Sequence, residues 1–386
     1  MNYSYRVLKP HFETILPADR PILAVEDIDG DSSLEFLVGV RELHVTDEHG
    51  SDKWSYPTRG TFQSLVTRYS LDSSAYLALS TDRVFDAICG SADAISILCH
   101  EGYVYLFTAG GEQILKTSHQ GEITNIAVWK SHDGTASVLI GTADLDAQNR
   151  IIFLDQTGQA RWALVTPGQV SALFVPQLSS GIFLAGTGQG KLLAVSDRGQ
   201  LIWQQQVGNT RLVDIRFIGS PQHGEYIMAV TRSGHLAAFS SDGQILWQNN
   251  ASPIATVVCV RCGDINNDGE TEIVVGSRTA ISCYDFRGNS LWNTPLEKSL
   301  HSFDLLCGRV EDQQLLLACT GSSGVILRAG DGAFLGQLLL GGHGLACKSV
   351  ARDHLNGWIV CRARPAENRL WRILGHQDID LLFIQA

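Results

Sequence analysis

AVSDRGQLIW, residues 194–203, is one copy of a repeated block that decides the architecture of this chain. In each copy an apolar run leads to a Gly, and a Trp follows four residues after that Gly. The other copies are FLDQTGQARW (153–162), AFSSDGQILW (238–247), CYDFRGNSLW (283–292) and the more divergent HVTDEHGSDKW (44–54). Each block predicts a β-hairpin whose turn Gly takes a positive φ. A Trp at a fixed offset also predicts the same packing site in every repeat.

A second marker precedes each hairpin, an apolar run that in most copies closes in a small residue. The marker residues are Gly39, Ser80, Gly141, Gly186, Val230, Gly276, Cys319 and Cys361, so successive spacings are 41, 61, 45, 44, 46, 43 and 42 residues. A four-stranded propeller blade needs about 40 to 45 residues. The sequence therefore predicts an all-β fold, a single eight-bladed β-propeller of four-stranded antiparallel blades, with seven blades as the alternative.

The repeat also predicts that residues 1–386 form one domain, because blades bury their apolar faces only against one another. The expected blades cover residues 20–59, 60–119, 120–168, 169–209, 210–252, 253–299, 300–343 and 344–386, with residues 1–19 closing the ring. Joining the chain ends in one sheet would remove exposed sheet edges. Residues 3–8 and 379–384 are the strands we expect at that closure.

Composition excludes several classes of protein. The formal net charge of -11 argues against a nucleic-acid-binding surface, which needs a basic face to neutralise phosphates. The N-terminal segment lacks the apolar core of a signal peptide, and no run approaches the roughly 20 apolar residues of a membrane helix. The nine Cys, mostly within apolar runs, are typical of buried thiols in a reducing compartment. We therefore expect a cytoplasmic protein.

Two acidic loops carry the clearest chemical pattern. DINNDGETE (264–272) has oxygen-bearing side chains at positions one, three, five and nine, with Gly269 at the sixth position. This spacing is typical of a Ca²⁺ loop, because alternate residues of a tight turn point carboxylates inward. DIDGDSSLE (27–35) repeats it with Ser32 in place of the Gly. The alternative is that these residues cap turns through side-chain to backbone hydrogen bonds.

The segment GDINNDGETEIVVGS resembles the FG-GAP repeat of integrin α-chain propellers, and the hairpins that end in Trp resemble quinoprotein-type, PQQ-like repeats. The FG-GAP resemblance implies structural Ca²⁺ held by Asp264, Asn266, Asp268 and Glu272, and by Asp27, Asp29, Asp31 and Glu35. Both resemblances imply a β-propeller, and neither implies an activity.

No catalytic or zinc-binding pattern emerges. Cys259 and Cys262 form a C-x-x-C within a strand-like run, where positions three apart point to opposite faces. Quinoprotein enzymes often carry adjacent Cys, which this chain lacks, and no H-E-x-x-H or G-x-S-x-G segment occurs. His301 and His343 fall at blade junctions without a neighbouring nucleophile. We expect no enzyme; the alternatives are a quinoprotein-like enzyme with a central-channel site and a module that senses Ca²⁺ or a small ligand.

Two segments are candidates for protein contact. The 61-residue spacing indicates an insertion within TDRVFDAICGSADA, where Arg83, Val84, Phe85 and Ile88 are the candidate contacts. Arg362 and Arg364 alternate on one strand face of the last blade. The pattern favours a non-catalytic scaffold that binds protein partners as a subunit of a cytosolic complex, without membrane or nucleic acid.

Overall fold

The computed structural model describes residues 13–16, 22–26, 35–38, 42–47, 51–57, 61–69, 75–82, 101–108, 110–130, 136–143, 148–175, 181–220, 224–250, 256–306, 313–352, 355–365 and 377–385. These residues contain β-strands and turns but no helix. The chain forms two compact units. We call Pro21–Ile215 the N-terminal unit, and Arg216–Ala386 together with Met1–Arg20 the C-terminal unit.

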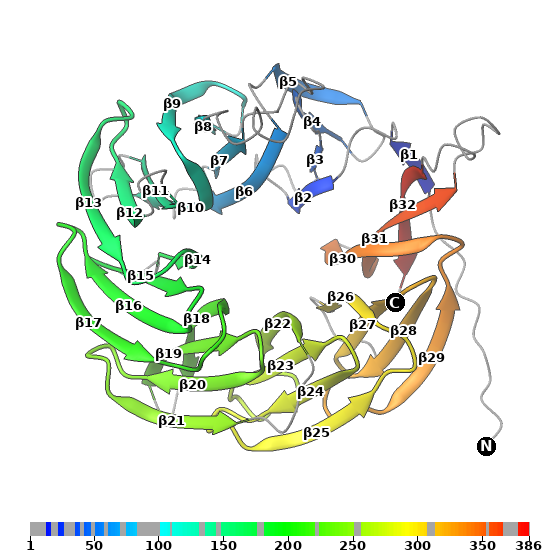
Figure 1. Ribbon diagram of the computed structural model, residues 1–386. Helices are drawn as coiled ribbons and strands as arrows, with labels where there is room; N and C mark the ends of the chain where they lie inside the picture. The colour runs from blue at the N-terminus through cyan, green and yellow to red at the C-terminus, as the bar shows by residue number, and fades with distance from the viewer. Residues whose placement is uncertain are drawn as a thin grey trace, which may run out of the picture. The chain divides into compact units, whose positions relative to one another are not determined.

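The described strands of the N-terminal unit form antiparallel sheets of four consecutive strands (Figure 1). The first two sheets comprise β2 (Ile22–Glu26), β3 (Glu35–Val38), β4 (Glu42–Thr46) and β5 (Asp52–Pro57), then β6 (Thr61–Tyr69), β7 (Ala75–Asp82), β8 (Glu101–Thr108) and β9 (Gln113–Gln120). The next two comprise β10 (Glu122–Lys130), β11 (Ala136–Ala143), β12 (Asn149–Leu154) and β13 (Ala160–Thr166), then β14 (Val170–Phe174), β15 (Ile182–Thr187), β16 (Lys191–Ser196) and β17 (Leu201–Gln206).

The C-terminal unit follows the same plan, and its first strand begins just before the unit boundary. Its sheets comprise β18 (Leu212–Ser220), β19 (Gly224–Thr231), β20 (His235–Phe239) and β21 (Ile245–Asn250), then β22 (Val257–Gly263), β23 (Glu272–Ser277), β24 (Ala280–Tyr284) and β25 (Ser290–Pro295). The next comprises β26 (Leu300–Leu305), β27 (Leu315–Thr320), β28 (Ser323–Arg328) and β29 (Phe334–Leu339). The last comprises β30 (His343–Arg352), β31 (Leu355–Pro365), β32 (Gln377–Gln385) and β1 (Glu13–Leu16).

The last sheet joins strands from both ends of the chain. β1 pairs antiparallel with β32, with Glu13 opposite Leu382 and Leu16 opposite Ile379. The C-terminal partner is the segment 379–384 that the sequence predicts. The N-terminal partner is Glu13–Leu16, whereas the predicted residues 3–8 lie outside the described part of the chain.

The hairpin turns of the repeated block are held by a short polar side chain three residues before the Gly. Oδ1 of Asp155 accepts hydrogen bonds from the backbone N–H groups of Thr157 and Gln159 at 2.8 and 3.1 Å. Asp285 and Ser196 make the equivalent pairs of bonds in their own turns. The hydroxyl of Thr157 and these backbone donors lower the pKa of Asp155 to about 2, against the opposing effect of burial.

Four of the block Trp residues pack on the turn of the next hairpin along the chain. A Cβ built on Gly288 would lie 2.5 Å from the Trp247 ring, so only a glycine fits beneath it. The same relation holds for Trp54 with Gly111, Trp162 with Gly199, and Trp292 with Gly332. Trp247 Nε1 also donates to the carbonyl of Phe286 at 3.1 Å. The common packing site predicted for the repeat Trp is therefore confirmed at these four positions.

The small marker residues have a related cause. A Cβ on Gly141 would lie 2.7 Å from Val170, the first residue of the next sheet. A Cβ on Gly276 would lie 2.6 Å from both Leu300 and Phe303. Large apolar side chains on the first strand of one sheet thus occupy the space that a marker glycine leaves open on the sheet before it. This complementarity packs successive sheets closely within each unit.

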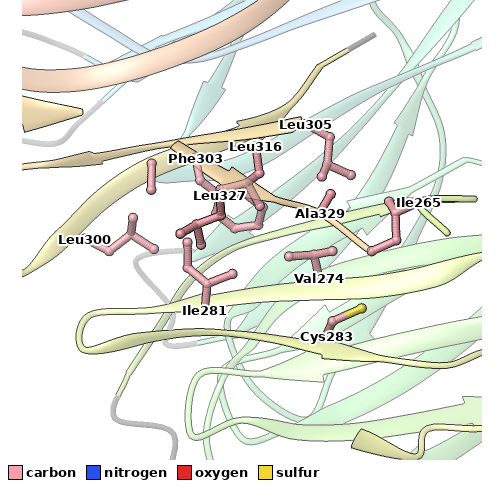
Figure 2. Packing of buried hydrophobic residues seen from close by; sticks show 11 residues of the cluster. Ile265, Val274, Ile281, Cys283, Leu300, Phe303, Leu305, Leu316, Leu327 and Ala329 are labelled. Carbon is pink, nitrogen blue, oxygen red and sulfur yellow. The ribbon is translucent and has the colours of Figure 1, made fainter. Parts of the chain in front are cut away.

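The apolar core lies between neighbouring sheets. Figure 2 shows the cluster between the β22–β25 and β26–β29 sheets, where Phe303 and Leu316 are fully buried beside Val274. An equivalent cluster in the N-terminal unit stacks the rings of Phe153 and Trp162 with centroids 5.5 Å apart. In the β22–β25 sheet burial falls from the middle strands to the last strand. β23 is buried throughout, whereas every residue of β25 is exposed or half-buried.

Candidate functional site

The predicted Ca²⁺ loop lies between β22 and β23, where Gly263 and Glu272 pair across the base of the turn. Its sharp bend uses two residues with positive φ, Asn267 at 68° and Gly269 at 86°. Ile265 points into the core cluster of Figure 2 and anchors the loop to the following sheet. Thr271 Oγ1 donates to the carbonyl of Gly219 at 3.0 Å and anchors it to the preceding sheet.

Hydrogen bonds within the loop bring the predicted ligands together. The Asp264 carboxylate accepts from the backbone N–H groups of Asn267 and Gly269, at 2.7 and 3.2 Å. The Asn266 amide nitrogen lies 2.9 Å from Asp268 Oδ2 and 3.1 Å from Glu272 Oε1. The alternative role of these residues as turn caps is thus realised in the structure. The described residues contain no group of three or more His, Cys, Asp or Glu side chains placed to hold a metal ion.

Glu272 gives the loop a buried carboxyl group among negative charges. Its residue is 1% exposed, and Oε2 accepts a hydrogen bond from the Ile265 N–H at 2.9 Å. Burial raises the pKa of Glu272 to about 7, the charges of Asp268 and Asp264 add to this effect, and the backbone donors oppose it. A cation between these oxygens would relieve the repulsion.

Glu270 adds a carboxylate that the sequence pattern does not assign. Both of its carboxylate oxygens are buried and have no hydrogen-bond partner among the described residues. Its charge contributes to the raised pKa of Tyr226, which burial dominates. Tyr226 in turn donates its hydroxyl to the Phe286 carbonyl at 2.7 Å.

The second predicted loop is only partly described, because Asp27, Asp29 and Asp31 lie outside the described residues. Glu35, which pairs with Glu26 as Glu272 pairs with Gly263, is completely buried. Glu35 Oε1 accepts a hydrogen bond from Lys53 Nζ at 2.7 Å. A lysine ammonium group therefore neutralises this carboxylate, and the sequence spacing gives no sign of it.

The predicted partner contacts fall largely outside what the structure describes. Arg83, Val84, Phe85 and Ile88 belong to the undescribed segment between β7 and β8. Arg362 and Arg364 are part of β31, and their backbones pair with Asp380 and Asp378 of β32. Cys259 and Cys262 lie on β22 and form no disulfide, and burial raises the pKa of Cys259 to about 12. No helix of the described chain is long and apolar enough to cross a membrane.

The outer strands carry a feature that the sequence analysis does not single out. Within the C-terminal unit, β21, β25 and β29 are each the last strand of a sheet and pair on one side only. Together they contain no Asp, Glu, Lys or Arg. They expose six large apolar side chains, Ile245, Leu246, Leu291, Phe334, Leu335 and Leu339, to between 41% and 83%. In β21 the signal in the sequence is the apolar pair Ile245 and Leu246 just before the block Trp.

Comparison with known proteins identifies the fold. The profile of a family described as outer membrane protein assembly factor BamB matches residues 42–222 and 100–311, which is more than half of the chain. This match supports the quinoprotein-type resemblance and gives no support to the FG-GAP resemblance. A search of curated proteins finds no match.

Solved structures agree on the fold at low sequence identity. BamB from Moraxella catarrhalis is 13% identical, with a TM-score of 0.62 over 98% of this chain and 100% of that one. Sqt1 from Saccharomyces cerevisiae is 11% identical, with a TM-score of 0.67 over 99% and 100%. BBS1N, crystallised in complex with ARL6DN, is 12% identical, with a TM-score of 0.58 over 99% and 98%. The four-stranded antiparallel sheets of this chain are accordingly those of a β-propeller.

Proposed function

The chain belongs to the family of outer membrane protein assembly factor BamB, and from that premise we propose that it is a non-catalytic scaffold that binds protein partners. We place it in a cytosolic multiprotein complex, where thiols such as its nine Cys stay reduced. BBS1N, a chain of similar fold, was crystallised with a protein partner, which supports binding of this kind. Eight blades closed into a ring through β1 and β32 would form the scaffold.

The observation that carries the proposal is the charge-free outer edge formed by β21, β25 and β29. Soluble proteins usually protect an exposed sheet edge with charged residues, especially Lys, because unpaired backbone groups and apolar side chains attract other strands. In the N-terminal unit β17 also lacks charged residues and exposes Leu201 and Ile202, whereas the outer strands β5, β9 and β13 follow this rule with Lys53, Lys116 and Arg161. The three strands of the C-terminal unit do not.

The chemistry of this edge indicates its partner. Each strand offers unpaired backbone N–H and C=O groups along one side, which an extended segment satisfies by adding as a fifth strand. Aliphatic side chains beside that edge favour uncharged, apolar side chains on the incoming segment, since a charged one would lose its hydration there. We therefore propose an extended, uncharged segment of another protein as the ligand. The segment that holds Arg83 and Phe85, and the pair Arg362 and Arg364, remain candidates for further contacts.

Charge placed on this edge tests the proposal. We expect the triple variant Leu246→Lys, Leu291→Lys, Leu335→Lys to recover at least about tenfold less protein partner than the wild type. Three ammonium groups on the outer strands oppose the addition of another strand. Tagged wild-type and variant proteins are compared by affinity purification from native cells with quantitative mass spectrometry. Val165→Lys is the matched control, since Val165 is equally exposed on β13, a strand that already carries Arg161.

Equal partner recovery by the triple variant and the wild type would show that β21, β25 and β29 do not bind the partner. Purification of the wild-type protein without any partner would contradict the proposed scaffold function. In that case the quinoprotein-like enzyme becomes the hypothesis to test, by a search for a bound cofactor.

We further propose that the loop 264–272 binds structural Ca²⁺ through Asp264, Asn266, Asp268 and Glu272. The negative charges of Asp268 and Asp264 near the buried Glu272 support this proposal. Rotation of the Asn266 amide would direct its oxygen, the ligand atom that Ca²⁺ prefers, toward the site. The loop 27–35 should bind more weakly, because Lys53 already neutralises Glu35.

Calcium should therefore stabilise the protein through one loop. We expect millimolar Ca²⁺ to raise the midpoint of thermal unfolding by about 3 °C relative to a chelator, since a ligand bound only to the native state stabilises that state. The Asp268→Asn variant should lose this shift, whereas Asp331→Asn, at an exposed carboxylate on another turn, should retain it. Equal midpoints with Ca²⁺ and with chelator would show that the loop is held by its own hydrogen bonds.

A further inference from the structure

The junction between the β26–β29 sheet and the last sheet differs from the junctions that are packed around a marker glycine. At Gly141, Gly186 and Gly276 a marker glycine makes room for the next sheet, as Gly276 does for Leu300 and Phe303. In the β26–β29 sheet the marker position holds Cys319. Cys319 pairs with Ser302 beside a bulge, as Gly276 pairs with Cys259, so the two positions are equivalent.

The last sheet changes in a complementary way. Its first strand, β30, has the same bulge, and its register places Gly344 and Cys347 where Leu300 and Phe303 lie on β26. The large apolar pair is thus replaced by a glycine and a thiol. Cys319 therefore occupies the marker position of one sheet, and Cys347 occupies the position on the next sheet that packs against it.

The contacts of Cys347 place its thiol beside the residues that surround Cys319. Cys347 Sγ lies 3.8 Å from Ser302 Oγ, and Ser302 is the residue directly opposite Cys319. The same sulfur donates to the carbonyl of Leu317, two residues before Cys319, at 3.6 Å. Cys347 and Cys319 belong to one buried cluster, with exposures of 6% and 0%. The Cys319 thiol and burial raise the pKa of Cys347 well above the ordinary value.

We propose that Cys319 and Cys347 form a redox site that closes to a disulfide between the two sheets. The oxidant is a small or protein disulfide. One thiolate attacks it, forms a mixed disulfide and releases one thiol; the second thiolate then displaces the other half. Two S–H bonds are replaced by one S–S bond, and the oxidant takes up two electrons and two protons as it becomes two thiols.

The position of this site means that the disulfide would link two neighbouring sheets covalently. The last sheet also holds β1 and β32, so it joins strands from both ends of the chain. A bond from Cys347 to Cys319 fixes this sheet covalently to the sheet before it. In the folded state the buried thiols are unreactive, because burial disfavours the thiolate that attacks. Oxidation therefore proceeds through local opening of the last sheet, and its rate should rise in mild denaturant.

Peptide mapping tests the inference on the full wild-type chain. The protein is incubated with oxidised glutathione with and without low urea, alkylated, digested with trypsin and analysed without reduction. Residues 310–328 and 329–348 form separate tryptic peptides that each contain one Cys, Cys319 and Cys347 respectively. We expect a cross-linked pair of these two peptides, the loss of two titratable thiols, and a rise of about 5 °C in the midpoint of thermal unfolding.

Two cysteine variants distinguish the Cys319–Cys347 disulfide from oxidation of other cysteines. Cys347→Ser should abolish both the cross-linked peptide and the rise in the midpoint. Cys283→Ser should retain both, because Cys283 is equally buried but belongs to a different cluster. Both thiols remaining alkylatable after oxidation in urea, or a cross-link to another Cys, would overturn the proposal. The mapping on wild-type protein holds even if a variant fails to fold.

Discussion

Gly288→Ala should lower the free energy of unfolding by about 2–4 kcal/mol. Gly288 has a φ of 80°, which costs an L-residue roughly 1 kcal/mol, and the new methyl would lie 2.5 Å from the Trp247 ring. The Trp247 ring has little room to move away. Its Nε1 donates a hydrogen bond to the Phe286 carbonyl, and its ring packs against that of Tyr226 with centroids 5.9 Å apart. The substitution should therefore separate two neighbouring sheets of the C-terminal unit.

Two further glycines separate the effect of the positive φ on stability from the effect of the contact with Trp247. Gly224 has a φ of 78° but an open space around its Cβ position, so Gly224→Ala should cost only about 1 kcal/mol. Gly336 has neither a positive φ nor a neighbour within 4 Å, so Gly336→Ala should change stability by less than about 0.5 kcal/mol. Urea unfolding followed by Trp fluorescence measures all three. Equal losses at Gly288 and Gly224 would show that the Trp contact contributes nothing.

Asp304→Ala should cost about 2–4 kcal/mol, because one buried carboxylate connects three sheets of the C-terminal unit. Asp304 Oδ1 accepts from Arg261 Nε of β22, and Oδ2 accepts from the Ser349 N–H of β30 at 2.7 Å. Its side chain is 8% exposed, whereas that of Arg261 is 31% exposed, so water screens part of the loss. Removing the carboxylate takes away the acceptor of the Arg261 Nε–H and that of the buried Ser349 N–H, and it leaves the half-buried guanidinium without its counter-ion.

An exposed ion pair in the same unit provides the control for Asp304. Arg328 and Asp331 form a pair at 2.8 Å with side chains 39% and 51% exposed. Asp331→Ala should therefore cost less than about 1 kcal/mol, although it also removes an acceptor for the Ala333 N–H. A loss at Asp304 no larger than at Asp331 in urea unfolding would contradict the bridging role.

Local turn chemistry explains why the repeat could be predicted from the sequence. A Gly three residues after a Ser or Asp, between two alternating strands, has few other conformations, and positive φ at Gly158 and Gly288 confirms the prediction. The fixed offset of the Trp likewise predicts one packing site, because the strand that carries it has a period of two. These signals act over about ten residues and need no knowledge of the register between sheets.

Contacts between strands distant in sequence could not be predicted in this way. Neutralisation of Glu35 by Lys53 depends on how the last strand of the first sheet folds over its acidic loop. The facing of Cys319 and Cys347 appears only when the registers of two sheets are compared. The charge-free edge depends on which strand is last in each sheet, and the repeated block does not show that order.

Backbone amide hydrogen exchange of the full chain, with and without its purified partner, tests most directly the claim that the partner adds as a strand. We predict that binding slows exchange at amides of β21, β25 or β29, while the buried strand β23 is unchanged. A new backbone ladder is what protects an edge amide. Protection confined to the loops that join the strands, with exchange at all three outer strands unchanged, would contradict the account.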